Sequence, residues 1–358
     1  QDVAQGTYRA SGIYGIKPML DGEHYTQISS DRKRIVKYSF KTGEEVETIF
    51  DVTTARDCSL TSFDDYIMSP DERLILIQTE TKPIYRRSFT AVYYIYNVRN
   101  NKLKPLSNNG PQQVPLFSPD GNQIAFVRNN NIYLVKLLFN NSESQVTKDG
   151  EYNKVLNGIP DWVYEEEFGF NRAFDFSADS KMLAYIRFDE SAVKMFSFPW
   201  YKGMAPEKMQ YETYPGSYDY KYPKSGMQNS LVSVHTFDIK SKVTRTMDLQ
   251  LDKEDYIPRI RFTSDPEKLA IMVLNRHQNR FDLYFANPRS TLCKVAIRDE
   301  APQYIKEQAY ANIEFFDKNI VMMSERDGYN HLYLYTIGGN LVKQITKGDF
   351  EVKDFLGW

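Results

Sequence analysis

The chain has 358 residues, of which 41% are hydrophobic and 14% aromatic, and its 45 basic and 47 acidic residues leave a net charge of −2. This neutral balance excludes the basic footprint expected of a nucleic-acid-binding protein. No stretch approaches the ~18 to 20 apolar residues that a membrane-spanning helix requires, and the high aromatic content favours β-sheet.

A short pattern recurs along the chain: a turn rich in Asp, Ser, Pro or Gly, followed by an apolar run typical of a strand. Two clear copies are MSPDERLILIQ and FSPDGNQIAFV. Six such turns are marked by the aspartates Asp21, Asp71, Asp120, Asp179, Asp265 and Asp317. Each copy continues with an aromatic strand, a polar turn and another short strand, as in VYYIYNVRNNKLKPLS.

One unit therefore has about fifty residues and roughly four strands. Radial repetition of four-stranded units is how a β-propeller protects the edges of its sheets. The fixed long period does not suit a β-sandwich, and solenoid repeats are usually shorter. We predict an all-β fold, a β-propeller of four-stranded blades with about six blades present.

The spacings between the six aspartates are 50, 49, 59, 86 and 52 residues, so the two enlarged spacings locate insertions. The first insertion contains PDWVYEEEF, residues 160–168. The second contains SFPWYKGMAPEKMQYETYPGSYDYKYPKSG, residues 197–226, which is rich in Tyr, Pro and Gly. Loops that interrupt a regular scaffold frequently carry function.

Several kinds of site are missing from the sequence. It contains no G-x-S-x-G nucleophile elbow and no glycine-rich phosphate loop. The four histidines are scattered, and no cluster of Cys and His has the spacing of a zinc site. We therefore predict no metal and no cofactor.

The acidic run Glu165, Glu166 and Glu167 follows Trp162 and Tyr164 and has two interpretations. Pro160 and Asp161 are typical of a helix start, where glutamates in the first turn favour the positive end of the helix dipole, so the run could be a solvated helix tip.

The aromatic residues instead suggest that the segment packs against the protein. Two neighbouring carboxylates can share a protonated amine through charge-assisted hydrogen bonds. A free peptide N-terminus, with an ordinary pKa of about 7.7–8.0, is such a cation at neutral pH. On this interpretation, the pair selects peptides with a free amino end.

The segment DWVYEEE inside a four-stranded repeat protein resembles the glutamate motif of the dipeptidyl peptidase IV family, in the prolyl oligopeptidase clan. The resemblance extends over essentially the whole chain. It includes MSPDERLILIQTETKPIYRRSFTAVYYIYNV, the run FSADSKMLAYIRFDE after the glutamates, and SERDGYNHLYLY. The glutamate motif is highly specific, whereas SPDG turns are shared by many propellers.

The resemblance implies roles for individual residues. Glu166 and Glu167 match the two glutamates that anchor the amino terminus of the substrate. Arg86 matches the arginine that binds the carbonyl between the first two substrate residues, with Arg87 as the second choice. A further arginine–aromatic pair of the family has no clear match in QYIKEQAYANI, where Tyr310 is the nearest aromatic residue.

The resemblance also implies an eight-bladed propeller followed by a C-terminal α/β-hydrolase domain with catalytic Ser, Asp and His. Residues 1–358 would then be a partial N-terminal propeller without the hydrolase domain, inactive alone, and either self-associating or open at its unmatched blade faces. The full-length protein would be a serine dipeptidyl aminopeptidase that removes X-Pro or X-Ala dipeptides from peptides with a free N-terminus. We expect it to be a homodimer in the periplasm or outside the cell.

Three alternatives remain open. A propeller that binds protein partners would share the repeats but would not need the acidic insertion. A tripeptidyl peptidase of the same clan would also have a propeller, although the full run of three glutamates argues against it. A glycan-binding or glycosidase propeller would place carboxylates on different blades across a central pocket.

Overall fold

The computed structural model describes residues 2–8, 12, 14–201 and 214–357. In this part of the chain the fold is all-β, with only two short α-helices and one 3₁₀ turn. The residues divide into two compact units, which are described separately: unit 1 contains residues 1–82 and 90–111, and unit 2 contains residues 83–89 and 112–358.

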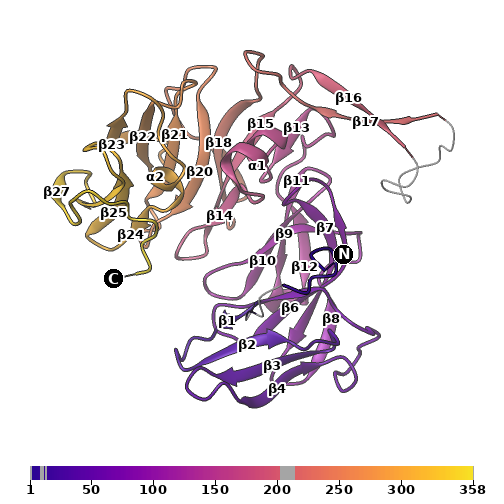
Figure 1. Cartoon of the computed structure of the whole chain (residues 1–358). Helices are drawn as coiled ribbons and strands as arrows, with labels where there is room; N and C mark the ends of the chain where they lie inside the picture. The colour runs from indigo at the N-terminus through magenta and orange to yellow at the C-terminus, as the bar shows by residue number, and fades with distance from the viewer. Residues whose placement is uncertain (1, 9–11, 13, 202–213, 358) are drawn as a thin grey trace. The chain divides into compact units, whose positions relative to one another are not determined.

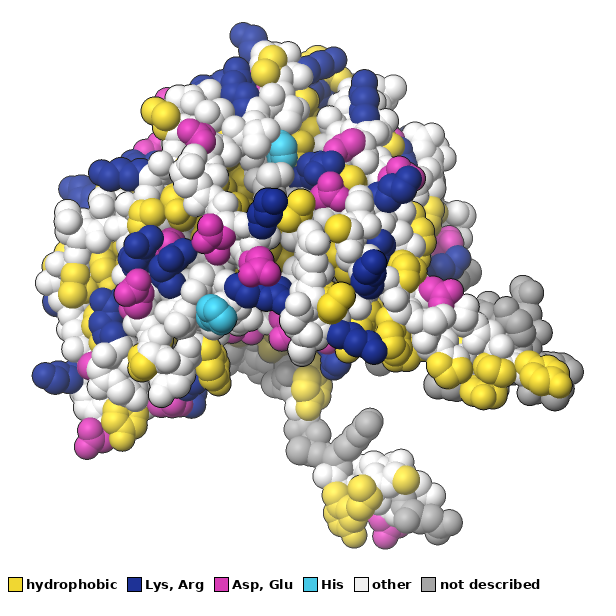
Figure 2. Space-filling model, turned by 90° about the horizontal axis from the view of Figure 1, so that it is seen from above, with side chains coloured by type: hydrophobic (Ala, Val, Ile, Leu, Met, Phe, Trp, Pro, Cys, Tyr) yellow, Lys and Arg dark blue, Asp and Glu magenta, His cyan; other side chains and the backbone are white. Residues whose placement is uncertain are grey.

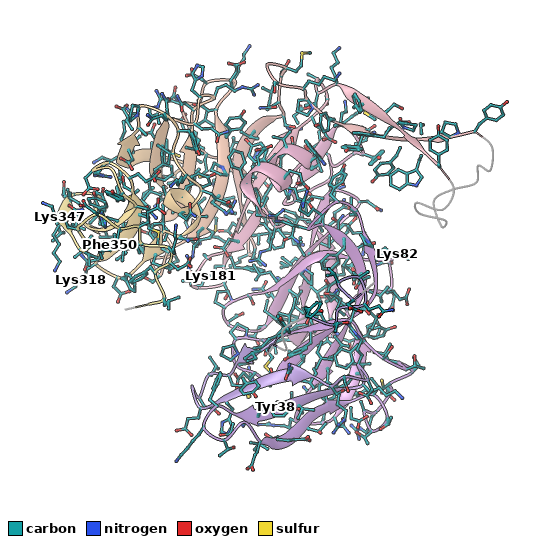
Figure 3. The ribbon with its side chains drawn as sticks, viewed as in Figure 1. Tyr38, Lys82, Lys181, Lys318, Lys347 and Phe350 are labelled. Carbon is teal, nitrogen blue, oxygen red and sulfur yellow. The ribbon has the colours of Figure 1, made fainter. Side chains whose placement is uncertain are left out.

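Unit 1 contains two four-stranded antiparallel sheets in which neighbouring strands follow one another along the chain. The first sheet consists of β1 (Lys17–Pro18), β2 (His24–Ile28), β3 (Arg34–Ser39) and β4 (Glu45–Asp51). The second consists of β5 (Asp65–Met68), β6 (Leu74–Pro83), β7 (Phe89–Asn97) and β8 (Lys102–Pro105). Tyr38 of β3, labelled in Figure 3, stacks on Tyr25 of β2 with ring centroids 5.3 Å apart.

Unit 2 contains the four remaining large sheets (Figure 1). The third sheet in chain order consists of β9 (Gln113–Phe117), β10 (Gln123–Arg128), β11 (Asn131–Lys136) and β12 (Ser142–Gln145). The fourth sheet consists of β13 (Val155–Asn157), β14 (Phe174–Phe176), β15 (Met182–Asp189), β18 (Leu231–Asp238) and β19 (Val243–Thr246). The 3₁₀ turn η1 (Leu137–Phe139) follows β11.

The last two sheets consist of β20 (Tyr256–Phe262), β21 (Leu269–Leu274), β22 (Arg280–Ala286) and β23 (Cys293–Glu300), then β24 (Glu314–Phe315), β25 (Asn319–Ser324), β26 (His331–Thr336) and β27 (Leu341–Gln344). Helix α1 (Trp162–Phe168) lies between β13 and β14, and α2 (Gln308–Ala311) lies between β23 and β24. This succession of four-stranded antiparallel meanders confirms the predicted all-β, propeller-type fold.

Several central strands of unit 2 are buried on both faces, because the sheets of this unit pack against one another. All six residues of β21, Leu269–Leu274, are buried. They belong to a cluster that also includes Tyr164 and Phe168 of α1, Ile257 of β20 and Tyr310 of α2. The helix that carries the glutamates is therefore anchored in the core of unit 2.

Five of the six predicted repeat turns join the first two strands of their sheets, and the turn at Asp179 joins β14 and β15. In three of them a serine hydroxyl donates to the aspartate two residues later: Ser69 to Asp71, Ser118 to Asp120 and Ser177 to Asp179. The same hydroxyl accepts the N–H of the residue that opens the next strand, such as Met182 at 2.9 Å from Ser177. The serine hydroxyl of each Ser-x-Asp turn therefore links the aspartate to the start of the next strand.

The fourth sheet departs from the expected four strands, because β13 and β14 both pair with β15. The segment between β13 and β14 that contains α1 forms the first insertion. The second insertion forms the hairpin of β16 (Met195–Trp200) and β17 (Gly216–Lys221), which extends away from the sheets in Figure 1. Residues 202–213 of that insertion lie outside the described residues.

The surface reflects the near-neutral composition, because basic and acidic side chains are interspersed on the face that Figure 2 shows. Over the described ranges, no helix is long and apolar enough to cross a membrane. The same part of the chain contains no group of three His, Cys, Asp or Glu side chains arranged to hold a metal ion.

Candidate functional site

Helix α1 has well-defined ends, and its start at Asp161 is the one that the sequence predicts. Asp161 is the N-cap, and its Oδ1 accepts the N–H of Tyr164 at 2.9 Å. Its other oxygen accepts the hydroxyl of Ser230, which satisfies this buried carboxyl. At the other end, Gly169 is the C-cap with φ of 67°, a left-handed conformation that glycine adopts without strain.

The aromatic residues of the motif fix the helix on two sides. Tyr164 is fully buried, and its hydroxyl accepts the N–H of Ile257 at 3.2 Å. On the opposite side, the ring of Trp162 packs against Tyr222, with centroids 4.3 Å apart. A helix of seven residues is too short to be stable alone, so these contacts determine where its acidic residues lie.

The three glutamates have three different environments. Glu165 is 1% exposed, Glu166 is half-buried and Glu167 is exposed. Successive residues of a helix point about 100° apart, which explains the divergence. Only Glu165 lies in the first turn. Glu166 and Glu167 lie near the C-terminal end, where the helix dipole disfavours negative charge.

These positions contradict the interpretation of the run as a solvated helix tip matched to its dipole. One of the three carboxylates is buried, and the other two lie at the less favourable end of the helix. A cation near Glu166 and Glu167 would relieve both their mutual repulsion and the unfavourable dipole.

Arg86 provides part of this positive charge. It lies in residues 83–89, the connection between β6 and β7, which belongs to unit 2. Its Nε is 2.9 Å and 3.2 Å from the two carboxylate oxygens of Glu166. The side chain of Arg86 is 70% exposed, so the guanidinium remains accessible while it is paired. The structure thus brings together Arg86 and Glu166, which are 80 residues apart in sequence.

The second choice, Arg87, is also near α1. A Cβ on Gly169 would lie 3.6 Å from Nη2 of Arg87 and 2.9 Å from Oε1 of Glu307. Glu307 also accepts from Nη2 of Arg259 at 3.2 Å, and Arg259 lies over the ring of Phe170. These residues form a mixed-charge group next to the C-terminus of α1, which the sequence analysis did not identify.

Tyr310 is placed in the core. Its side chain is 3% exposed and packs against Phe168, with ring centroids 6.0 Å apart. Burial raises the pKa of its phenol, and the nearby carboxylates of Glu307 and Glu167 act in the same direction. Tyr310 therefore supports α1 through its contact with Phe168, and its buried ring does not present a surface for a substrate.

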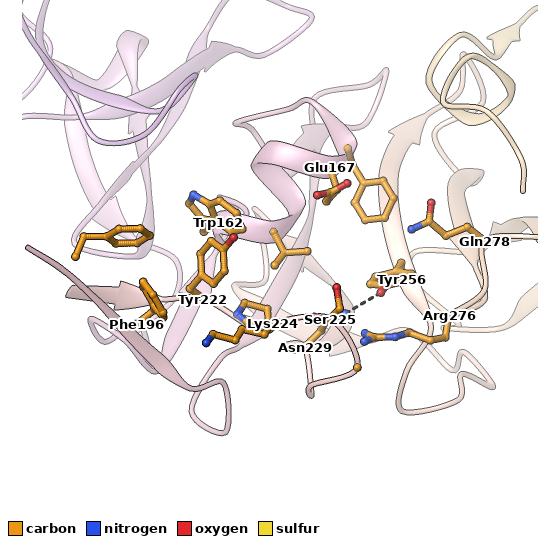
Figure 4. A pocket seen from close by; sticks show the side chains of 15 residues that line it. Trp162, Glu167, Phe196, Tyr222, Lys224, Ser225, Asn229, Tyr256, Arg276 and Gln278 are labelled. Atoms are coloured by element: carbon orange, nitrogen blue, oxygen red, sulfur yellow. Dashed lines mark hydrogen bonds between the residues drawn. The ribbon is translucent and has the colours of Figure 1, made fainter. Parts of the chain in front are cut away.

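A pocket of about 680 Å³ opens beside Glu167 in unit 2 (Figure 4). Its walls include the aromatic rings of Trp162 and Tyr222. Across the pocket, Asn229 donates to the hydroxyl of Tyr256 at 2.8 Å, and Arg276 lies beside this pair. The two insertions were the sequence signals for this pocket, and no residue pattern pointed to Asn229 or Arg276.

Comparisons with known proteins agree with this description. The family model of the dipeptidyl peptidase IV (DPP IV) N-terminal region matches residues 69–358. The chain therefore belongs to the dipeptidyl peptidase IV N-terminal region family.

Among curated relatives, dipeptidyl peptidase 4 of Trichophyton equinum is 30% identical over 357 residues, which cover 96% of this chain and 44% of the relative. The probable dipeptidyl peptidase 4 of Aspergillus fumigatus is 31% identical over 303 residues, covering 81% of this chain and 39% of the relative. This chain thus spans less than half the length of these relatives.

Among solved structures, Porphyromonas gingivalis dipeptidyl peptidase 4 matches with a TM-score of 0.92 and 40% identity, over 99% of this chain and 49% of that one. A putative dipeptidyl aminopeptidase IV from Bacteroides ovatus has a TM-score of 0.72 at 20% identity, over 97% and 48% of the two chains. The second match supports the fold alone, whereas the first also supports the family resemblance proposed from the sequence.

Proposed function

We propose that this chain is the substrate-anchoring propeller of a dipeptidyl peptidase IV-like serine exopeptidase. In this proposal, Glu166 and Glu167 bind the protonated amino terminus of a peptide, and Arg86 binds the carbonyl after its first residue. The single observation that carries the proposal is the placement of the two glutamates together at the C-terminal end of α1, with the exposed Arg86 beside them.

The chemistry suits a peptide amine. Glu167 is exposed and can accept from an ammonium group, while Glu166 is half-buried and already contacts one cation. An ammonium has three donors and can be shared between two carboxylates. Arg86 contacts Glu166 through Nε, so the rest of its planar guanidinium can donate to a carbonyl oxygen nearby.

Such a site would fix the distance between the amino terminus of the substrate and the peptide bond that is cleaved. If the amine is held at a fixed place, only one peptide bond lies within reach of a nucleophile on another domain, so dipeptides are released. Positioning of this kind can supply roughly 7–11 kcal/mol of the reduction in a reaction barrier. The relatives are named dipeptidyl peptidase 4, in agreement with this mode of cleavage.

The remaining parts of the proposal come from the family resemblance. The catalytic Ser, Asp and His would lie in a C-terminal α/β-hydrolase domain, and the substrates would have Pro or Ala in second position. The full-length protein would act as a homodimer in the periplasm or outside the cell, and it would use no cofactor.

The test uses the full-length protein with chromogenic Ala-Pro amides that have a free or an acetylated amino terminus. We expect hydrolysis of the free form only, with dipeptide as the product. Because the amine must be charged, the specificity constant for the free form should fall as pH rises above the amine pKa of about 8. Equal hydrolysis of the acetylated form would refute amine anchoring, and faster release of a tripeptide from a free Ala-Ala-Pro amide would favour the tripeptidyl alternative.

A further inference from the structure

Glu165, the first glutamate of the run, has a role that neither the motif nor the proposed function assigns. Its carboxylate is 1% exposed. Oε1 accepts two successive backbone N–H groups, those of Arg87 at 2.6 Å and Ser88 at 2.8 Å. Oε2 is buried and has no hydrogen-bond partner among the described residues.

The segment that Glu165 contacts is a tight turn. The N–H of Ile84 donates to the carbonyl of Ser88 at 2.8 Å, which closes the turn around Arg86. From α1's side, Nδ2 of Asn171 donates to the carbonyl of Arg87 at 2.9 Å. Both backbone polar groups of Arg87, its N–H and its carbonyl, therefore bind residues of the α1 segment.

These tethers act directly on Arg86. The N–H of Arg87 belongs to the same planar peptide group as the carbonyl of Arg86. A hydrogen bond to that N–H therefore fixes the orientation of the peptide plane next to the Cα of Arg86. Hydrogen bonds from N–H groups to a carboxylate are charge-assisted and stronger than neutral ones. A buried carboxylate with one unpaired oxygen is costly, and a neutral side chain would fill the space at lower cost if packing were its only role.

We propose that Glu165 is a positioning residue that holds the turn of residues 84–88, so that Arg86 is presented beside Glu166 and Glu167. The three consecutive glutamates then divide their work. Glu165 binds the main chain of the turn, Glu166 pairs with the side chain of Arg86, and Glu167 remains open. This inference rests on the proposed function, because it explains how the carbonyl-binding arginine is placed.

The first test measures hydrogen exchange by mass spectrometry in the full-length protein and compares Glu165→Gln with a matched control, Asp175→Asn. Asp175 is also a carboxylate that accepts two backbone N–H groups, but it lies on β14 and its partners, Phe176 and Phe262, belong to β14 and β20. We expect exchange in peptides covering residues 83–89 to rise about 10-fold in Glu165→Gln and to stay unchanged in Asp175→Asn.

The second test is a double-mutant cycle on the specificity constant for a free Ala-Pro amide, using Glu165→Gln, Arg86→Ala and the combined variant. We expect Glu165→Gln alone to lower kcat/KM about 10-fold, mainly through KM, because the contact it supports is made in the ground state and the transition state alike. In the Arg86→Ala background the same substitution should cost less than about 2-fold.

If Glu165→Gln lowers kcat/KM equally in the wild-type and Arg86→Ala backgrounds, Glu165 binds substrate independently of Arg86 and the inference is overturned. If hydrogen exchange rises over the whole protein, Glu165 has only a general structural role, which also overturns the inference. If Glu165→Gln does not fold, Asn171→Ala removes the second tether at a more accessible position and should show the same coupling with Arg86→Ala at smaller size. Unchanged kinetics in Arg86→Ala, Glu166→Gln and Glu167→Gln would refute the proposed function instead, while the exchange result would still report on the tether.

Discussion

The acidic residues of the repeat turns and those of α1 differ in where their partners come from. Asp120 and Asp179 accept from Ser118 and Ser177, each two residues away. Glu165 and Glu166 accept from the turn of residues 84–88, between 77 and 80 residues away. A carboxylate whose side-chain partners are local stabilises its own turn, whereas one with distant partners holds two segments of the folded unit together.

The comparison gives a practical criterion for acidic residues in repeat proteins. Partial burial alone would raise the pKa of Asp120, but hydrogen bonds led by those from the Ser118 hydroxyl and the Asn122 N–H hold it below its ordinary value, so most of its charge is used within its own turn. At α1, by contrast, Glu167 is exposed at the unfavourable end of a helix. Substitutions should therefore affect folding in the first group and substrate binding in the second.

The largest expected effect is on substrate binding. Glu167→Gln in the full-length protein removes one charged hydrogen bond to the substrate amine and should lower kcat/KM by the equivalent of about 1.5–3 kcal/mol, with Glu166→Gln similar. Steady-state kinetics with a free Ala-Pro amide measures this effect. Wild-type kinetics in both variants would remove the distinction between the two acidic groups.

A buried carboxyl near α1 gives the next largest effect, on stability. Burial raises the pKa of Glu190 to about 7; Asp161 acts in the same direction, and Lys221 opposes it. The fold therefore favours protonated Glu190. The stability gained from the preferred protonation of Glu190 in the folded state is fully present below the ordinary pKa of about 4.5, and it is lost as pH rises through about 7.

Glu190→Gln keeps the side chain neutral, so at pH 8 it should stabilise the protein on the order of 1–3 kcal/mol relative to wild type. At pH 4 the two proteins should melt alike. Thermal melts at a series of pH values measure the difference. A stability gap that does not change with pH would show that Glu190 is not protonated by the fold.

A smaller effect is expected for Arg86→Ala, because this residue would hold a neutral carbonyl. Because the charged guanidinium is also 70% exposed and competes with solvent, the net loss should be about 0.5–1.5 kcal/mol and should raise KM with little change in kcat. Arg87→Ala is the matched control and tests the second choice directly. If Arg87→Ala raises KM and Arg86→Ala does not, the two assignments must be exchanged.

An effect of similar size, but on stability instead of substrate binding, is expected at the repeat turns. Asp120→Ala removes the acceptor for the Ser118 hydroxyl and the N–H of Asn122, and it should destabilise the protein by about 0.5–1.5 kcal/mol. The KM of the full-length protein should not change. A rise in KM without a loss of stability would contradict the separation between turn and site residues.

Much of this architecture could be predicted from the sequence because the repeat turns depend on neighbouring residues. The spacing of Ser118 and Asp120 already contains both partners of a turn, and Asp161 before an aromatic–acidic run contains a helix cap. Contacts over long distances have no such local signal. The ion pair of Arg86 with Glu166 was reached only through family resemblance, since nothing near either residue indicates the other.

The burial of Glu165 could not be predicted at all. Three identical residues in a row give no hint that one is 1% exposed while another is exposed to solvent. The five-stranded fourth sheet was also missed, because β13 and β14 are only three residues long and resemble loop segments. Short strands depend on their neighbours more than on their own sequence.

The two fixed ends of α1 have a consequence for how this segment can change in evolution. Because Asp161 and Gly169 set the start and the stop of the helix, the direction of each glutamate depends on its count from the cap. A substitution alters one direction, whereas inserting or deleting one residue turns every later side chain by about 100°. The motif should therefore accept an exchange at a single position more readily than a change in its length, because its length sets the direction of all three charges.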